Sequence, residues 1–141
     1  MNKSGPIIVI EDDKDDQELL SMVFEELNYH NRVIFFDDGV SAYEYLVSSK
    51  EHPFVIISDI NMHKMSGFEL RDQIHKNELL RLKCIPYLFF TTASDEKNVI
   101  DAYSKSVQGF FTKPNEYSEI LRVIGTIFKY WEECHSPNIT V

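Results

Sequence analysis

Short unbroken apolar runs alternate along this chain with longer segments whose apolar residues recur at helical spacing. The runs cover residues 7–10, 54–57 and 87–90, with weaker ones at 107–111 and 33–36. Runs without polar interruption are typical of strands buried on both faces of a parallel sheet. The pattern therefore predicts five buried strands.

Helical patterns fill the intervals between these runs. Apolar residues recur at helix spacing over 19–27, after the acidic pair 15–16, which suits a helix N-terminus. Ser66 and Glu69 have the spacing of a capping box and predict a helix that continues through Ile74.

Two further helices are predicted in the second half of the chain. Ser94 is expected to cap a helix that contains residues 99–103. The last helix carries one broad apolar stripe over residues 120–131, and residues 134–141 are predicted to be a frayed tail. Residues 37–39, Asp-Asp-Gly, are interpreted as a turn and helix cap.

The alternation predicts an α/β fold of five consecutive βα units, a (βα)5 arrangement. Right-handed crossovers would place helices on both faces of a doubly wound parallel sheet. The length of 141 residues, 43% hydrophobic, fits one globular domain over 1–141 with a core at about 6–130. In such sheets, ligands bind beyond the carboxyl ends of the strands.

Charge and composition narrow the function classes. The formal net charge is −9 and no lysine- or arginine-rich run is present, so nucleic acid and anionic membrane are poor candidate partners. The N-terminal apolar run is too short for a signal peptide or a membrane span, which predicts a cytoplasmic protein. Cys84 and Cys134 lack metal-binding spacing and are interpreted as reduced structural residues.

Charged residues follow several of the predicted strands. Glu11 and Asp12 end the first run, Asp59 follows the third, and Lys113 follows the last. Because parallel strands end at one edge of the sheet, these groups are expected to meet there. Clustered carboxylates repel one another unless a hard cation such as Mg²⁺ binds them. A carboxylate could then accept a phosphoryl group, stabilised by the lysine and by a hydroxyl of Thr91 or Thr92.

These residues resemble those of a response-regulator receiver domain over about residues 6–130. Five motifs occur in the family's order: Ile8-Val9-Ile10-Glu11-Asp12-Asp13, Ser58-Asp59-Ile60-Asn61-Met62, Met65-Ser66-Gly67, Pro86 through Thr91-Thr92, and Phe110-Phe111-Thr112-Lys113-Pro114. The resemblance implies a CheY-like, flavodoxin-like sheet with strand order 2-1-3-4-5.

The resemblance also implies a role for each residue of the site. Asp59 is expected to be the phosphoacceptor. Mg²⁺ is expected to bind Glu11, Asp12, Asp59 and the backbone carbonyl of Asn61.

The remaining expectations from the resemblance concern the switch and the partners. Thr91 is the expected switch hydroxyl, Phe110 the switch aromatic and Lys113 the phosphoryl-binding cation, joined to Pro114 by a cis bond. The phosphoryl donor would be a sensor histidine kinase or a histidine phosphotransfer protein. An unidentified downstream protein would read the signal, from a monomer or a weak homodimer that is not itself an enzyme.

The sequence departs from the family pattern at His63, where proline is usual, and at Ser66, which replaces an acidic or small residue. Losing proline removes a restraint on the loop after Asp59. His63 is interpreted as a solvated loop residue, not a metal ligand.

Three other functions fit parts of the pattern. A haloacid-dehalogenase-like phosphatase would need a second aspartate at position 61, which is Asn61. A flavodoxin-like cofactor binder would need a phosphate-cradling first loop, which here is acidic. A receiver fold that only docks partners, without phosphorylation, stays open.

Overall fold

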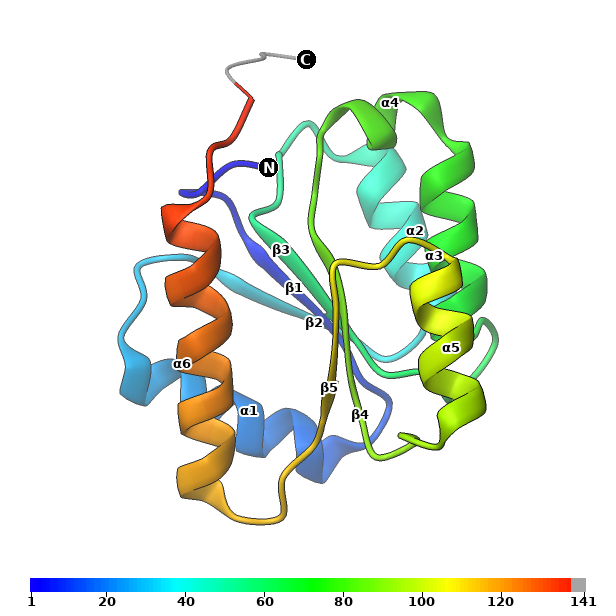
Figure 1. Cartoon of the computed structure of the whole chain (residues 1–141). Helices are drawn as coiled ribbons and strands as arrows, with labels where there is room; N and C mark the ends of the chain where they lie inside the picture. Colours follow the sequence, from blue (N-terminus) through cyan, green and yellow to red (C-terminus); the bar gives the residue numbers. More distant parts are fainter. Residues whose placement is uncertain (138–141) are drawn as a thin grey trace.

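The protein folds as a five-stranded parallel sheet between two layers of helices (Figure 1). The structure is a computed structural model and describes residues 1–137. The strands are β1 (Ile7–Ile10), β2 (Val33–Phe36), β3 (Val55–Ser58), β4 (Tyr87–Thr91) and β5 (Gly109–Thr112). Their order in the sheet, β2-β1-β3-β4-β5, confirms the expected topology.

Helices connect the strands. They are α1 (Lys14–Leu27), α2 (Gly39–Ser48), α3 (Gly67–Lys76), α4 (Glu78–Leu82), α5 (Glu96–Ser104) and α6 (Tyr117–Glu133). The five-residue α4 was not predicted, because one short turn leaves no helical periodicity in the sequence. The side chain of Asn77 caps it by accepting a hydrogen bond from the backbone N–H of Leu80.

Successive residues of the central strands pack alternately into two separate hydrophobic cores. Ile7 and Val9 of β1 pack with α1 and α6, whereas Ile8 and Ile10 pack against the side of α2, α3 and α5. All four β1 residues are at most 1% exposed. Burial on both faces explains why the strand reads as an unbroken apolar run.

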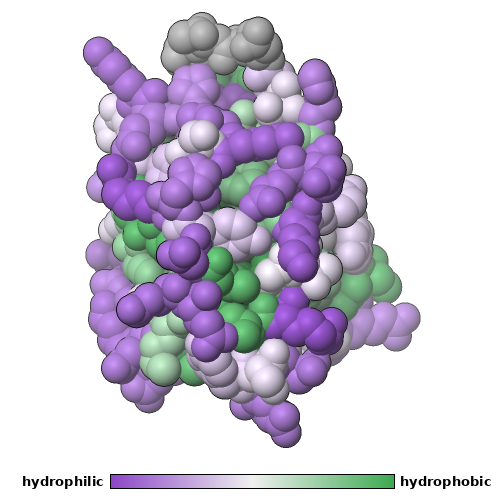
Figure 2. Space-filling view, turned by 90° about the vertical axis from the view of Figure 1, so that its left-hand side faces the viewer, coloured by the Kyte–Doolittle hydropathy of each residue, from purple (hydrophilic) through white to green (hydrophobic). Residues whose placement is uncertain are grey.

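The face of the molecule at the left of Figure 1 is mostly hydrophilic, with a smaller apolar area near its middle (Figure 2). The predicted apolar stripe of α6 is buried: Ile120, Ile124 and Phe128 pack with Ile7 and Val9 of β1 in one hydrophobic core. No helix within residues 1–137 has the length and apolar character needed to cross a bilayer.

Capping confirms two predictions and corrects one. Ser66 accepts a hydrogen bond from the Glu69 N–H at the start of α3, and Asp38 caps α2 in the same way through Ser41. Ser94 does not cap the next helix: α5 begins one residue later than a cap at Ser94 requires, with Asp95 at the N-cap position.

Two further expectations concern the chain ends and one peptide bond. No cis peptide bond occurs in the described part of the chain, so the expected cis bond before Pro114 is wrong. Of the predicted tail, residues 138–141 lie outside the described residues.

Two glycines provide a matched test of this packing. A Cβ at Gly67 would lie 2.2 Å from the Asp59 carbonyl oxygen and 2.7 Å from the Phe89 ring, whereas a Cβ at Gly125 would meet only Leu27 at 3.5 Å. We expect Gly67→Ala to lower the free energy of unfolding by about 1–3 kcal/mol through overpacking.

Gly125→Ala, in the middle of α6, should instead be neutral or stabilising by up to about 1 kcal/mol, because alanine favours helix. Urea denaturation of both variants checks the pair. Equal effects would show that the close contact at Gly67 does not constrain the loop after Asp59.

Candidate functional site

Two carboxylates are brought together by the register of β1 and β3. Ile10 and Ser58 are paired at the ends of these strands, so Glu11 and Asp59 follow at neighbouring positions. The backbone N–H of Asp59 donates to the Ile10 carbonyl at 3.1 Å and continues the ladder one step further. Adjacent strands lie about 4.8 Å apart, which places both side chains at the carboxyl edge of the sheet.

Lys113 reaches the same edge from the end of β5. Its backbone N–H donates to the carbonyl of Thr91 at 2.9 Å, which fixes the chain beside β4. Its ammonium nitrogen donates to carboxylate oxygens of Glu11, Asp16 (3.0 Å) and Asp59 (3.1 Å). The lysine side chain is only 11% exposed, so these ion pairs are shielded from solvent.

Asp59 is also held by two neutral donors. The Thr91 hydroxyl donates to Asp59 Oδ1 at 2.5 Å, and the backbone N–H of Ile60 donates to the same oxygen at 2.7 Å. The Thr91 oxygen in turn accepts from the Ala93 N–H at 3.1 Å. The predicted acceptor, hydroxyl and lysine therefore form one connected hydrogen-bonded group.

Burial shifts the pKa values of charged groups in this cluster. Desolvation raises the pKa of the Glu11 carboxyl to about 7, because it outweighs the opposing effect of Lys113. Desolvation alone would lower the pKa of Lys113, but Glu11, Asp59 and Asp16 outweigh it and hold that pKa above its ordinary value. The edge of the sheet thus carries more negative charge than one ammonium neutralises.

The other predicted residues of the site lie at its rim. Asp12 has a side chain that is 21% exposed, and its Oδ2 lies 2.9 Å from His63 Nδ1. His63 is 85% exposed, as expected for a loop residue, but it contacts a predicted metal ligand, which the sequence did not reveal. Asn61 lies in the exposed loop after β3.

The carboxylates surround Lys113 and do not form a ready-made metal cage. Within residues 1–137, no three His, Cys, Asp or Glu side chains are arranged to hold a metal ion. The chemistry of the donors nevertheless fits Mg²⁺, since Glu11, Asp12 and Asp59 offer only carboxylate oxygens and Glu11 is destabilised as an anion. A cation here would share these oxygens with Lys113.

Phe110, the predicted switch aromatic, is the second residue of β5. The half-buried ring packs against the core beneath α3 and α5, with its centroid 6.1 Å from that of Phe89. It comes three residues before Lys113, which directly follows this edge strand, so displacement of β5 would move both.

Asp16 and Gln17 belong to the site but were not predicted as such. Asp16 was assigned to the helix N-terminus, yet it binds Lys113. Gln17 donates from its amide to the backbone carbonyl of Glu11 and to Asp37 at 2.8 Å. Asp16 lies in the first turn of α1, soon after the end of β1, and this closeness to a strand end was the available signal.

A doubly wound sheet with carboxylates, a threonine and a lysine at its carboxyl edge is the architecture of receiver proteins. The family model described as the response regulator receiver domain matches residues 7–125. The chain therefore belongs to the response-regulator receiver domain family of two-component signalling.

Relatives of similar length support this assignment. The chain is 29% identical over 129 residues to the probable methanogenesis regulatory protein FilR2 of Methanothrix harundinacea, covering 89% of this chain and 82% of that protein. It is 29% identical over 137 residues to the response regulator Rcp1 of Synechocystis sp., covering 94% and 92%. A solved structure of the Mn²⁺-bound form of response regulator Rcp1 superposes with a TM-score of 0.78 at 27% identity, covering 93% and 97%.

The raised pKa of Glu11 generates a pH prediction. Between about pH 4.5 and pH 7 the folded protein holds a proton on Glu11 that the unfolded chain has lost, so the free energy of unfolding falls as pH rises through this window. Glu11→Gln should remove roughly 1–3 kcal/mol of this fall, since one pKa unit corresponds to about 1.4 kcal/mol.

Denaturation at several pH values in EDTA measures the slope. Glu18→Gln, which removes an exposed acid from α1, is the control and should keep the wild-type slope. A wild-type slope in Glu11→Gln would contradict the assignment of this proton to Glu11.

Proposed function

We propose that Asp59 accepts a phosphoryl group from a phosphohistidine of a sensor kinase or a histidine phosphotransfer protein. The observation that carries this proposal is the hydrogen-bonded group in which Thr91 and Lys113 both bind the Asp59 carboxylate. One Asp59 oxygen forms the new bond to phosphorus while the phosphorus–nitrogen bond of the donor breaks, and the imidazole leaves with the electron pair.

Each neighbouring group has a task in this transfer. Lys113 is a mobile point charge that can move from the Asp59 carboxylate to a phosphoryl oxygen. The Thr91 hydroxyl, already 2.5 Å from Asp59, can donate to another phosphoryl oxygen. Glu11 and Asp12, with Asp59 and the Asn61 carbonyl, would hold Mg²⁺, which neutralises charge on the phosphoryl group.

The signal would leave through β5. When Thr91 and Lys113 turn toward the phosphoryl group, the strand that carries Phe110 is drawn with them, and the surface of α5, β5 and α6 changes. A local change in charge thereby biases a two-state element.

We further propose that the chain acts as a single receiver domain in the cytoplasm, where kinases have access to ATP. Its output would pass to a separate protein through a monomer or a weak dimer. The similar lengths of FilR2 and Rcp1 support a single domain, since the chain covers 82% and 92% of them.

Intact-mass spectrometry after incubation with acetyl phosphate and Mg²⁺ tests the acceptor. The wild type should gain one phosphoryl group, and Asp59→Asn should gain none, because an amide is not a competent nucleophile. Asp101→Asn, on α5, is the matched control and should be phosphorylated like the wild type. An adduct that persists in Asp59→Asn would mean that another residue is the acceptor.

Metal binding can be tested without phosphorylation. Mg²⁺ at ten times its dissociation constant should raise the free energy of unfolding by about 1.4 kcal/mol, because it binds the folded state. Asp12→Asn should reduce this gain strongly. Sodium chloride at matched ionic strength controls for screening, and an equal gain from sodium would argue against a specific site.

A further inference from the structure

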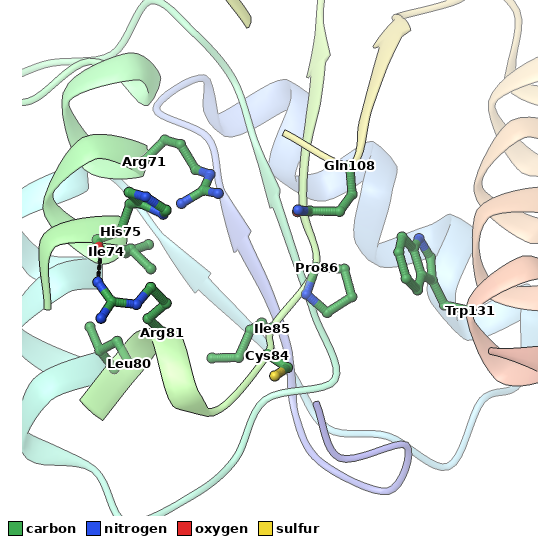
Figure 3. A pocket seen from close by; sticks show the side chains of 10 residues that line it. All are labelled: Arg71, Ile74, His75, Leu80, Arg81, Cys84, Ile85, Pro86, Gln108 and Trp131. Carbon is green, nitrogen blue, oxygen red and sulfur yellow. Dashed lines mark hydrogen bonds between the residues drawn. The ribbon is translucent and has the colours of Figure 1, made fainter. Parts of the chain in front are cut away.

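A second pocket, of about 280 Å³, lies at the edge of the sheet opposite the candidate phosphorylation site (Figure 3). It is bounded by α3, by α4 and by the segments that lead into β4 and β5. Pro86 and Gln108 line it immediately before these two strands begin. At about 3.3 Å per residue, the five residues of β4 separate it from the carboxyl edge by roughly 16 Å.

Arg71 is the unusual residue of this pocket. The residue is 8% exposed, and its Nε has no hydrogen-bond partner among residues 1–137. One guanidinium nitrogen, Nη2, donates to the Ser106 carbonyl at 3.2 Å. The neighbouring acid, Asp72, is bound by Lys105 at 2.9 Å, so it does not pair with the guanidinium.

A buried guanidinium without a counter-ion is energetically unfavourable. Burial lowers the pKa of Arg71 below its ordinary value, and it outweighs the opposing effects of the nearby Tyr87 and Asp72. Buried charges in folded proteins are normally paired, because desolvation costs several kcal/mol per ion. An anion in the pocket would supply the missing partner and could use the two-pronged geometry of the guanidinium.

The other polar residues of the lining also suit an anion. Arg81 and His75 lie on the same side of the pocket as Arg71, and Arg81 donates to the His75 carbonyl at 3.1 Å (Figure 3). Within the described part of the chain, no aspartate or glutamate lines the pocket. This local excess of positive charge contrasts with the net charge of −9 of the whole protein.

The remaining lining is apolar. Ile74 and Leu80 come from the helices, and Trp131 of α6 faces them across the pocket (Figure 3). Pockets for drug-sized ligands usually measure about 300–1,000 Å³, so this one suits a smaller molecule. An apolar wall beside a cationic group matches a ligand with an oxyanion at one end and a hydrocarbon body at the other.

We propose that this pocket binds a small organic oxyanion, a carboxylate or a phosphate monoester with an apolar body, and that Arg71 is its main anion-binding residue. The site is separate from Asp59 and does not rest on the proposed phosphoryl transfer. It would give the receiver a ligand input at the edge away from phosphorylation.

Trp131 is the chain's single tryptophan, so its fluorescence and its indole N–H resonance report directly on the pocket. Titration with benzoate and with phenyl phosphate, in EDTA, should change both signals saturably. Benzyl alcohol, which has the ring without the charge, should bind at least tenfold more weakly. Equal binding of the alcohol, or no saturable change with either anion, would overturn the proposal.

Substitutions test which residue of the protein binds the anion. Arg71→Met should weaken binding of both anions at least tenfold, and Arg71→Lys should weaken it less, because it keeps the charge but loses the planar fork. Arg122→Met removes an exposed arginine of α6 that pairs with Glu119, and it should bind like the wild type.

Asp59→Asn should also bind the anions like the wild type, which separates this pocket from the phosphorylation site. Circular dichroism verifies folding of each variant. If Arg71→Met does not fold, the comparison of benzoate with benzyl alcohol on the wild type decides the matter. Unchanged binding in a folded Arg71→Met would refute the role of Arg71.

Discussion

Lys113 places a shielded ammonium among the carboxylates of Glu11, Asp16 and Asp59, and the carboxyl edge of the sheet depends on this contact. Glu11 is 2% exposed and would be strongly disfavoured as an unpaired anion. The same contact joins β5 to β3 and to the neighbouring elements β1 and α1, which lie about 100 residues earlier in the chain than β5. It therefore holds these elements together at the carboxyl edge of the sheet and orients the side chains that the proposed phosphoryl transfer uses.

The charges of this cluster do not cancel, and the excess of carboxylates over ammonium groups favours the binding of a further cation. One lysine faces three carboxylates, while burial still favours the protonated form of Glu11. A site with surplus buried negative charge is prepared for a divalent cation, and a lysine with several partners can exchange one of them for another anion. The same excess of buried negative charge that destabilises this edge of the sheet would thus favour the binding of a cation there.

The buried cations at the two ends of the sheet have opposite environments. At the carboxyl edge, Lys113 is surrounded by acids, and its pKa is held above the ordinary value. At the other edge, Arg71 is buried with one carbonyl partner, and its pKa is lowered by burial. Carboxylates of the protein itself pair with Lys113, whereas the anion proposed above would supply the missing partner of Arg71.

Much of the architecture could be predicted from the sequence because its cause is local. Residues 7–10 are uniformly apolar since both faces of β1 are covered, and Ser66 caps α3 through a contact only three residues away. The meeting of Asp59 and Lys113 could be predicted because each directly follows a strand, and parallel strands end together.

Other features were decided by tertiary packing. The pairing of Asp16 with Lys113 brings the start of α1 to the end of β5, across 97 residues of chain. The contact between His63 and Asp12 depends on the path of an exposed loop. Arg71 has no carboxylate partner, and its neighbour Asp72 is bound by Lys105, the residue that follows α5. The sequence determined which residues are charged and which strands are buried, but the partner of each charge depends on long-range packing, which no local pattern records.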